Sequence, residues 1–173
     1  MEKITKSIKK RKTANDVFIT PISLVNQHID LIKDLIEPNP DKVIYDAFYG
    51  TGNYYNQLKE RFPNNQIEYT EISLGSDFFD FNKKVDYIIS NPPYSIIDKV
   101  LEKSCDLNPT IISYLIGFMN LTTRRIEYMN KRGYFIQSLH LTKVMDWFGM
   151  SIIITFSNQI NTNCISYDRV VHK

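Results

Sequence analysis

Four consecutive residues, Asn91, Pro92, Pro93 and Tyr94, have side chains suited to binding a flat nitrogen group. The segment Val85–Ser90 before them is mostly apolar and predicts a strand that delivers Asn91 at its end. The two prolines remove backbone N–H donors and restrict the turn, so the Pro92 carbonyl is left to accept a hydrogen bond. The Asn91 amide oxygen and that carbonyl are together able to accept both hydrogens of an exocyclic amine. The Tyr94 ring offers a face on which an extruded base stacks.

A second candidate motif contains Asp46, Phe48, Gly50 and Gly52, between an apolar strand and a predicted helix. The glycines allow the backbone to approach a ligand closely, and the carboxylate at the strand end is able to hold an ammonium or hydroxyl group. A tight turn alone would also require glycines, so both interpretations stay open on this segment. No third glycine of a dinucleotide fingerprint follows, and no Gly-Lys-Ser/Thr phosphate loop occurs, which disfavours a phosphate-bearing cofactor.

Two further acids follow at informative positions. Glu71 ends the next predicted strand, 25 positions after Asp46. In nucleotide-binding βαβ units a carboxylate about 20 residues along accepts hydrogen bonds from ribose hydroxyls. Asp77 lies in a loop beside Phe78 and Phe79, where it could accept from an adenine amine while a ring covers the base. A solvated acid at a strand end and an ordinary turn residue are the alternatives for these two positions.

Strands and helices alternate in the predicted elements. A helix is expected to follow Thr20, as its cap, and Pro21, with Leu24 to Ile36 at helical spacing. The other predicted helices are Asn53–Arg61, Ile96–Cys105 and Thr122–Lys131, and the predicted strands are Lys42–Ala47, Gln66–Ile72, Val85–Ser90, Thr110–Ile116, Tyr134–Leu139 and Ser151–Phe156. This order predicts an α/β fold with a doubly wound, mostly parallel sheet and a ligand crevice at the carboxyl ends of its strands. Asn163–Val170 is expected to pair with the last strand as an antiparallel edge hairpin.

Length and composition predict a single domain. The chain has 173 residues, 43% of them hydrophobic, which suits one domain over 17–173 with no separate target-recognition domain. Residues 1–16 read as a flexible basic arm, because six of the 21 basic residues precede residue 13 against one acid. Such an arm suits phosphate contacts, and a solvated leader is the alternative. No membrane-spanning or signal-peptide pattern is present, so a cytoplasmic protein is expected.

Metal and disulfide chemistry is not indicated. The two cysteines, Cys105 and Cys164, are too few for a disulfide framework or a cysteine zinc site and suit buried positions in a reducing compartment. The histidines at 28, 140 and 172 are scattered, and no spacing supports a metal site. Basic residues in the second half could follow phosphates or simply form a solvated helix face. These are Arg124, Arg125, Lys131, Arg132 and Lys143.

From Phe18 to Phe156 the motifs together resemble the S-adenosylmethionine-dependent adenine-N6 methyltransferases of nucleic acids, which have a Rossmann-like class I fold. The resemblance implies that Thr20 contacts the cofactor carboxylate and that Asp46, Phe48, Gly50 and Gly52 surround its methionine part. It also implies Glu71 on the ribose, Asp77 on the adenine amine, and Asn91, Pro92, Pro93 and Tyr94 as the catalytic loop. Ala47 replaces a usual proline. The second aromatic that closes over the flipped base lacks a clear motif and is sought at Trp147 or Phe148.

The resemblance implies transfer of a methyl group from S-adenosylmethionine to the N6 amine of adenine in DNA. RNA adenine and a protein glutamine amide remain alternative targets, because both present a planar nitrogen to the same motif. A non-catalytic methyltransferase-like subunit that binds nucleic acid is an alternative of another class. The expected partner is nucleic acid, DNA first, and no membrane. A homodimer or a separate specificity subunit is left open.

Overall fold

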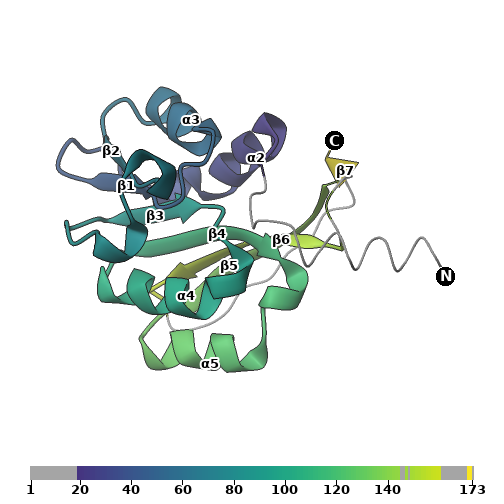
Figure 1. The fold of residues 1–173 in the computed structure, drawn as a ribbon. Helices are drawn as coiled ribbons and strands as arrows, with labels where there is room; N and C mark the ends of the chain where they lie inside the picture. The colour runs from purple at the N-terminus through teal and green to yellow at the C-terminus, as the bar shows by residue number, and fades with distance from the viewer. Residues whose placement is uncertain (1–18, 145–146, 148, 161–170, 173) are drawn as a thin grey trace.

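The computed structural model describes residues 19–144, 147, 149–160 and 171–172, which build a sheet with helices on both faces (Figure 1). The described strands lie in the order β2-β1-β3-β4-β6-β5-β7. Their bounds are β1 Val43–Asp46, β2 Gln66–Tyr69, β3 Tyr87–Ser90, β4 Ile111–Gly117, β5 Phe135–Val144, β6 Ser151–Ser157 and β7 Val171–His172. The strands from β2 to β4 pair in parallel, and β6 is antiparallel to both of its neighbours.

Helices cover the sheet in two pairs. The helices α2 (Ile22–Ile32) and α3 (Asn53–Arg61) lie on one face, and α4 (Ile97–Asp106) and α5 (Thr123–Lys131) lie on the other (Figure 1). Successive strand residues alternate between the two resulting cores, because side chains of a strand point to opposite faces. In β3, Ile89 packs with the first pair of helices and Ile88 with the second. The doubly wound arrangement predicted from the sequence is confirmed.

Five short 3-10 turns connect these elements within the described residues. They are η1 Lys33–Leu35, η2 Ile72–Leu74, η3 Phe78–Asp80, η4 Tyr94–Ile96 and η5 Phe118–Asn120. Three of them, η2, η4 and η5, follow the strands β2, β3 and β4. They therefore lie at the carboxyl end of the parallel strands, where ligands bind in open α/β sheets.

The antiparallel hairpin of the sheet differs from the expected pairing of Ser151–Phe156 with Asn163–Val170. It consists of β5 and β6, which are consecutive in the chain and pair from Phe135 to Thr142 around a bulge between Ile136 and Ser138. Strand β5 continues five residues past the predicted end at Leu139, because β6 pairs with it as far as Thr142 and β7 pairs with Lys143 and Val144. The expected partner segment Asn163–Val170 lies outside the described residues, and β7 pairs with β5 in parallel.

The predicted cap of the first helix is wrong. Pro21 rather than Thr20 is the N-cap of α2, and the Pro21 carbonyl accepts from the N–H groups of Leu24 and Val25 at 3.0 Å each. The Thr20 hydroxyl makes no cap hydrogen bond and instead accepts from the Asn91 side chain at 3.1 Å. The hydrogen bond with Asn91, 71 positions along the chain, therefore takes the place of the expected cap hydrogen bond to the first turn of α2.

Cys105 is buried beside the Met129 sulfur, and burial raises the pKa of its thiol to about 12, in agreement with the predicted role of a small buried hydrophobe. The expected basic arm at residues 1–16, together with Phe148 and Cys164, lies outside the described residues. None of the helices in the described part of the chain combines the length and the apolar character that crossing a membrane requires.

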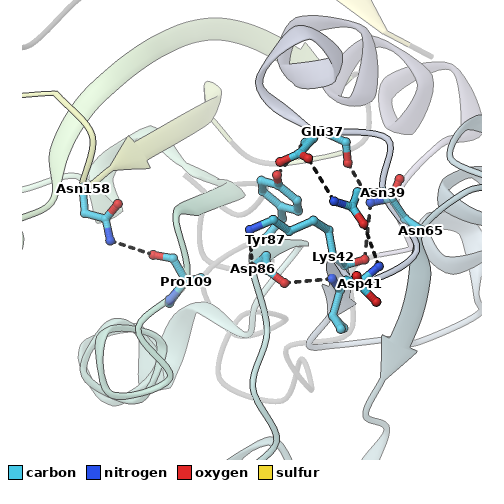
Figure 2. A network of polar contacts seen from close by, with 10 residues as sticks. Glu37, Asn39, Asp41, Lys42, Asn65, Asp86, Tyr87, Pro109 and Asn158 are labelled. Carbon is cyan, nitrogen blue, oxygen red and sulfur yellow. Dashed lines mark hydrogen bonds and ion pairs between the residues drawn. The ribbon is translucent and has the colours of Figure 1, made fainter.

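The amino-terminal end of the parallel strands is closed by side chains that bond to backbone (Figure 2). Asp86, just before β3, accepts from the Lys42 ammonium and from the Val43 N–H at 3.0 Å each, and so joins the starts of β1 and β3. The Tyr87 hydroxyl accepts from the Glu37 N–H at 3.1 Å. Asn158 donates to the Pro109 carbonyl at 3.2 Å, ahead of β4. These contacts leave the opposite, carboxyl end as the open one.

Replacing Asp86 with Ala is expected to destabilise the protein by about 2 kcal/mol, because it leaves the Val43 N–H without its acceptor and removes the largely buried carboxylate that pairs with Lys42. The exposed Asp41 offers a matched control, and Asp41→Ala should change stability by less than about 0.5 kcal/mol. Urea unfolding followed by circular dichroism measures both. Equal stability of Asp86→Ala and the parent chain would contradict the role given to this contact.

Candidate active site

A cavity of about 300 Å³ opens at the carboxyl ends of β1, β2 and β3. Five residues singled out in the sequence line it together: Thr20, Phe48, Gly50, Glu71 and Asn91. They come from four separate segments of the chain, so only the parallel sheet brings them together. Six further lining residues were not predicted as binding residues: Ile19, Tyr49, Thr51, Asn53, Tyr54 and Ser73.

Asp46 lies directly beneath this region, fully buried at the end of β1. The Ser90 hydroxyl at the end of β3 donates to its Oδ1 at 2.6 Å and accepts from the Phe48 N–H at 3.1 Å. Within the described residues, Oδ2 of Asp46 has no hydrogen-bond partner of ordinary geometry. Burial raises the pKa of Asp46 to about 7, against the lowering effect of the hydrogen bond from Ser90 and of the nearby N–H groups of Phe48 and Tyr55.

Glu71 lines the cavity just after β2. Its Oε1 accepts from the Ser73 hydroxyl at 2.7 Å and from the Ser73 N–H at 3.0 Å, while Oε2 accepts from the Gly50 N–H at 2.9 Å. Partial burial opposes ionisation, but these hydrogen bonds outweigh it and lower the pKa of Glu71. The carboxylate is therefore ionised at neutral pH and joins the loop after β1 to the turn after β2.

Gly52 is required where the loop after β1 turns into α3. Its φ of 83° lies in the left-handed region, and an added Cβ would come within 2.6 Å of the Tyr49 hydroxyl. Because Gly52 has no side chain, the Tyr49 ring has room to pack against other rings. Its centroid lies 5.5 Å from that of Tyr55 and 4.6 Å from that of Tyr69. The glycine thus shapes one wall of the cavity without lining it.

Thr20 connects the catalytic-loop candidate to the cavity wall. The Asn91 amide nitrogen donates to the Thr20 hydroxyl at 3.1 Å, and the Asn53 amide nitrogen donates to the Thr20 carbonyl at 2.8 Å. Because the Asn91 amide nitrogen points to Thr20, the amide oxygen of the same side chain points away from Thr20. The oxygen is the atom that a substrate amine would need as its acceptor.

The rest of the catalytic-loop candidate is a rigid corner between β3 and α4. Pro92 is buried, and Pro93 is the N-cap of η4 with φ −65° and ψ 126°. The Tyr94 ring is partly buried against the core under α4 and α5. The predicted motif therefore forms one continuous turn at the end of a buried strand, as expected from its residue types.

Tyr54 both packs in the core and borders the cavity. Its side chain is 4% exposed, yet it lines the cavity. Its hydroxyl lies 2.8 Å from Nδ1 of the buried His28, whose Nε2 lies 2.7 Å from the Ser113 hydroxyl. Burial lowers the pKa of His28 to about 3, so the imidazole is neutral at physiological pH and able to accept from Tyr54. No sequence pattern links these three positions.

Seven predicted site residues in the described part of the chain do not line the cavity: Asp46, Gly52, Asp77, Pro92, Pro93, Tyr94 and Trp147. Asp77 and Trp147 are placed on other parts of the molecule. The Asp77 carboxylate accepts from the Phe79 N–H at 2.9 Å as the cap of η3 and borders a separate, shallow hollow. Trp147 packs against Leu24, Leu115 and Ile153 at the α2 side of the sheet, beyond the end of β5. Their roles on the cofactor adenine and on the substrate base stay predictions.

The charged residues of the second half are mostly engaged in ion pairs. Arg124 and Arg125 share Asp98 at 2.7 and 2.6 Å, Arg132 pairs with Asp106 at 2.7 Å, and Lys131 pairs with Glu127 at 2.7 Å. Lys143 donates to the carbonyls of Trp147 and Gly149 at 2.7 Å each. The described residues contain no group of three acids, histidines or cysteines arranged to hold a metal ion.

Solved structures resemble this chain in fold. The precorrin-6y C5,15-methyltransferase from Geobacter metallireducens GS-15 matches with a TM-score of 0.59 and 13% identity, over 83% of this chain and 91% of its own. A chain of the E. cuniculi Mtq2–Trm112 complex, responsible for methylation of the eRF1 translation termination factor, matches with a TM-score of 0.59 and 18% identity, over 83% and 98%. The type I restriction-modification methyltransferase subunit from Streptococcus thermophilus matches with a TM-score of 0.62 and 12% identity, over 87% and 46%.

The chain has the Rossmann-like class I methyltransferase fold. No family model and no curated protein sequence matches it. The similar structures are named for a precorrin, a translation factor and a restriction-modification system, so the fold leaves the methyl acceptor open. The chain spans about half of the restriction-modification subunit that it matches.

The buried Asp46 predicts an unusual dependence of stability on pH. Its pKa is about 7 in the folded protein and near 3.8 in the unfolded chain, so the folded state binds more protons between these values. Its contribution therefore falls as pH rises from about 4 to about 7. Asp46→Asn should be more stable than the parent chain at pH 8, by up to about 4 kcal/mol, and this difference should shrink at pH 4.

Denaturant unfolding of both proteins across this pH range measures the effect. Asp34→Asn, at an exposed position, is the control and should leave the pH profile unchanged. A difference between parent and Asp46→Asn that stays constant from pH 4 to pH 8 would show that the carboxyl group does not titrate as described.

Proposed function

We propose that this protein transfers a methyl group from S-adenosylmethionine to the exocyclic N6 amine of adenine in DNA. The observation that carries the proposal is the shared cavity. The Asn91 amide, held by Thr20, borders the same 300 Å³ space as Glu71 and Gly50. An acceptor for a substrate amine and the residues suited to a nucleoside cofactor are thus adjacent, as methyl transfer requires.

The residues of the cavity fit the cofactor chemically. The ionised Glu71 keeps acceptor capacity on both oxygens and suits the hydroxyls of a ribose. The buried Oδ2 of Asp46, which lacks a partner of ordinary geometry among the described residues, suits an ammonium group, whose charge would also favour ionisation of that carboxyl. Phe48 and the Gly50 backbone would surround the methionine part, and Thr20 its carboxylate. Asp77 is proposed for the adenine amine.

When bound, S-adenosylmethionine supplies an electrophilic methyl group on a sulfonium. Asn91 and the Pro92 carbonyl would accept the two amine hydrogens of adenine, which favours a tetrahedral nitrogen with its lone pair turned toward that methyl carbon. The nitrogen–carbon bond forms as the carbon–sulfur bond breaks, and the electron pair stays on sulfur. The nitrogen is then cationic and acidic, and it releases a proton to water. The protein thus contributes position and hydrogen bonding rather than a strong base.

The target adenine would be extruded from its stack to reach this corner, and Tyr94 is proposed to stack on it. Trp147 and Phe148 are the candidates for the opposite face. Trp147 lies in the connection between β5 and β6, which starts at the carboxyl end of β5 beside the other functional loops. The proline-restricted turn would keep the Tyr94 ring in place before the base arrives.

DNA is favoured over the other acceptors by two features. The segment before residue 13 contains six basic residues and one acid, which suits a phosphate backbone. A methyltransferase subunit of a restriction-modification system shares the fold. RNA adenine and a protein glutamine amide present the same planar nitrogen, and the similarity to the Mtq2–Trm112 complex, named for methylation of a translation factor, keeps a protein acceptor as the second candidate.

The acceptor is tested by incubating the protein with labelled cofactor and DNA, RNA or protein. Treated nucleic acids are then digested to nucleosides and examined by mass spectrometry. N6-methyladenine from DNA is the expected product, because Asn91 and the Pro92 carbonyl match both hydrogens of that amine. Label found in protein alone would overturn the proposal in favour of the second candidate.

Asn91→Ala is expected to lower the methyl-transfer rate at saturating cofactor by at least about 100-fold, since it removes an acceptor that acts on the reacting nitrogen. Cofactor affinity, measured by calorimetry, should change less than the rate. Asn56→Ala, an exposed asparagine on α3, provides the control and should retain full activity. An unchanged product yield from Asn91→Ala would favour a non-catalytic, nucleic-acid-binding role.

Glu71→Ala is expected to weaken cofactor binding by at least about 10-fold, because it removes charge-assisted hydrogen bonds and loosens the Gly50 loop. Calorimetry with S-adenosylmethionine measures this, and Glu68→Ala, a neighbouring acid of β2 paired with Lys83 outside the cavity, is the matched control. Asp77→Ala should also weaken binding. Full affinity in both Glu71→Ala and Asp77→Ala would refute the assignment of the nucleoside part to this site.

A further inference from the structure

Three large apolar side chains are exposed together beside the candidate catalytic loop. Phe118, Met119 and Met150 are 46%, 84% and 44% exposed. Phe118 and Met119 belong to η5 at the end of β4, and Met150 precedes β6. The Phe118 N–H donates to the Met150 carbonyl at 2.8 Å, so the two segments are joined. We call these three residues the apolar shelf. Contiguous exposed apolar side chains of this kind mark binding surfaces.

The apolar shelf is continuous with Tyr94. Gly117, which immediately precedes Phe118, has no side chain, and a Cβ there would lie 3.6 Å from the Tyr94 ring and 3.2 Å from the Asn120 side-chain nitrogen. The Tyr94 ring and η5 therefore approach each other across a glycine. A base stacked on Tyr94 would leave its neighbours in the strand close to this shelf.

Basic side chains lie behind the shelf. The Arg125 guanidinium donates to the Asn120 carbonyl at 2.6 Å and so joins η5 to the start of α5. The adjoining cleft between α4 and α5 is lined by the basic residues Lys99, Arg124 and Arg125 and by the acids Asp98 and Glu102. Arg124 keeps 76% of its side chain exposed. The surface thus combines apolar faces with basic side chains, of which Arg124 and Arg125 pair with Asp98. Surfaces that bind single strands use apolar and basic side chains together.

We infer that the apolar shelf binds the nucleobases that flank the target adenine in an unpaired strand. This inference rests on the proposed function and narrows its substrate to single-stranded or locally unpaired DNA. In a continuous duplex the faces of the flanking bases stay stacked on other bases, and sugars and phosphates cover the outside. An apolar shelf gains contact only when those faces are accessible, whereas every unpaired base has a flat face that a Phe or Met side chain can cover.

The size of the shelf favours this occupant over a second copy of the chain or another protein. A stable protein interface buries about 800 Å² on each partner and involves about 20 residues. Three exposed side chains next to a turn cover a much smaller area. Two or three bases beside a flipped nucleotide match that area.

The experiment compares binding of two single-stranded oligonucleotides by fluorescence anisotropy. The first is a labelled thymidine oligonucleotide with one central adenosine, and the second carries abasic residues on both sides of that adenosine. The proteins are the parent chain, the double variant Phe118→Ala/Met119→Ala, and Leu31→Ala on α2, whose side chain is 40% exposed, as the control. The parent and Leu31→Ala should bind the abasic strand about 10-fold more weakly than the normal strand.

The double variant should bind the normal strand about 10-fold more weakly than the parent and should no longer distinguish the two strands. When the same oligonucleotide is annealed into a duplex, the parent chain and the double variant should bind it with similar affinity. The inference is overturned if the parent binds both strands equally, if the double variant keeps the full discrimination, or if the loss on the duplex is as large as on the single strand. A change of oligomeric state in the double variant with unchanged strand binding would instead identify an interface between copies.

Methylation of the central adenosine, measured in parallel, separates the two proposals. If methylated adenosine forms but the parent and the double variant bind the strands identically, nucleobase binding by the apolar shelf is refuted and the proposed reaction stands. The expected binding pattern without any methylated adenosine would refute the proposed reaction while strand binding by the shelf stands.

Discussion

The hydrogen bond between the Ser90 hydroxyl and the buried Asp46 carboxyl joins the ends of β3 and β1, and the candidate site depends on it. Strands β1 and β3 are neighbours in the sheet, but the chain leaves them in opposite directions, toward helices on opposite faces. A crevice opens where the chain diverges in this way. Because the Ser90 hydroxyl also accepts from the Phe48 N–H, it fixes the loop after β1 against the end of β3, next to Asn91.

This arrangement buries the Asp46 carboxyl, where ionisation of the group is unfavourable. A carboxyl with no exposed surface keeps its proton to higher pH than in water, and the fold accepts that cost at a position where a cationic ligand would reverse it. The Glu71 carboxylate, nearer to solvent and bound by Ser73 and Gly50, stays ionised instead. Two acids at the ends of adjacent strands thus have different protonation behaviour because of their burial and their donors.

The two ends of the sheet are specialised. At the amino-terminal end, Lys42, Asp86 and Asn158 bond to one another or to backbone and close the surface (Figure 2). At the carboxyl end, the loops contain glycines, prolines and short turns, and a cavity and the exposed side chains of η5 remain accessible. Rigid strands therefore carry the stability, while the loops that they position carry the groups able to do chemistry.

The sequence alone determined the element types, the parallel sheet and the motifs. Apolar strands followed by Gly50, Glu71 and Asn91 can be recognised without a structure, because strand periodicity and turn residues are local properties. Tertiary structure decided the partners. Thr20 binds Asn91 rather than capping α2, and β6 inserts between β4 and β5. Tyr54 lines the cavity while its hydroxyl contacts the buried His28. These outcomes depend on contacts between residues distant in the chain, whose energies outweigh the local preference and leave no periodic pattern in the sequence.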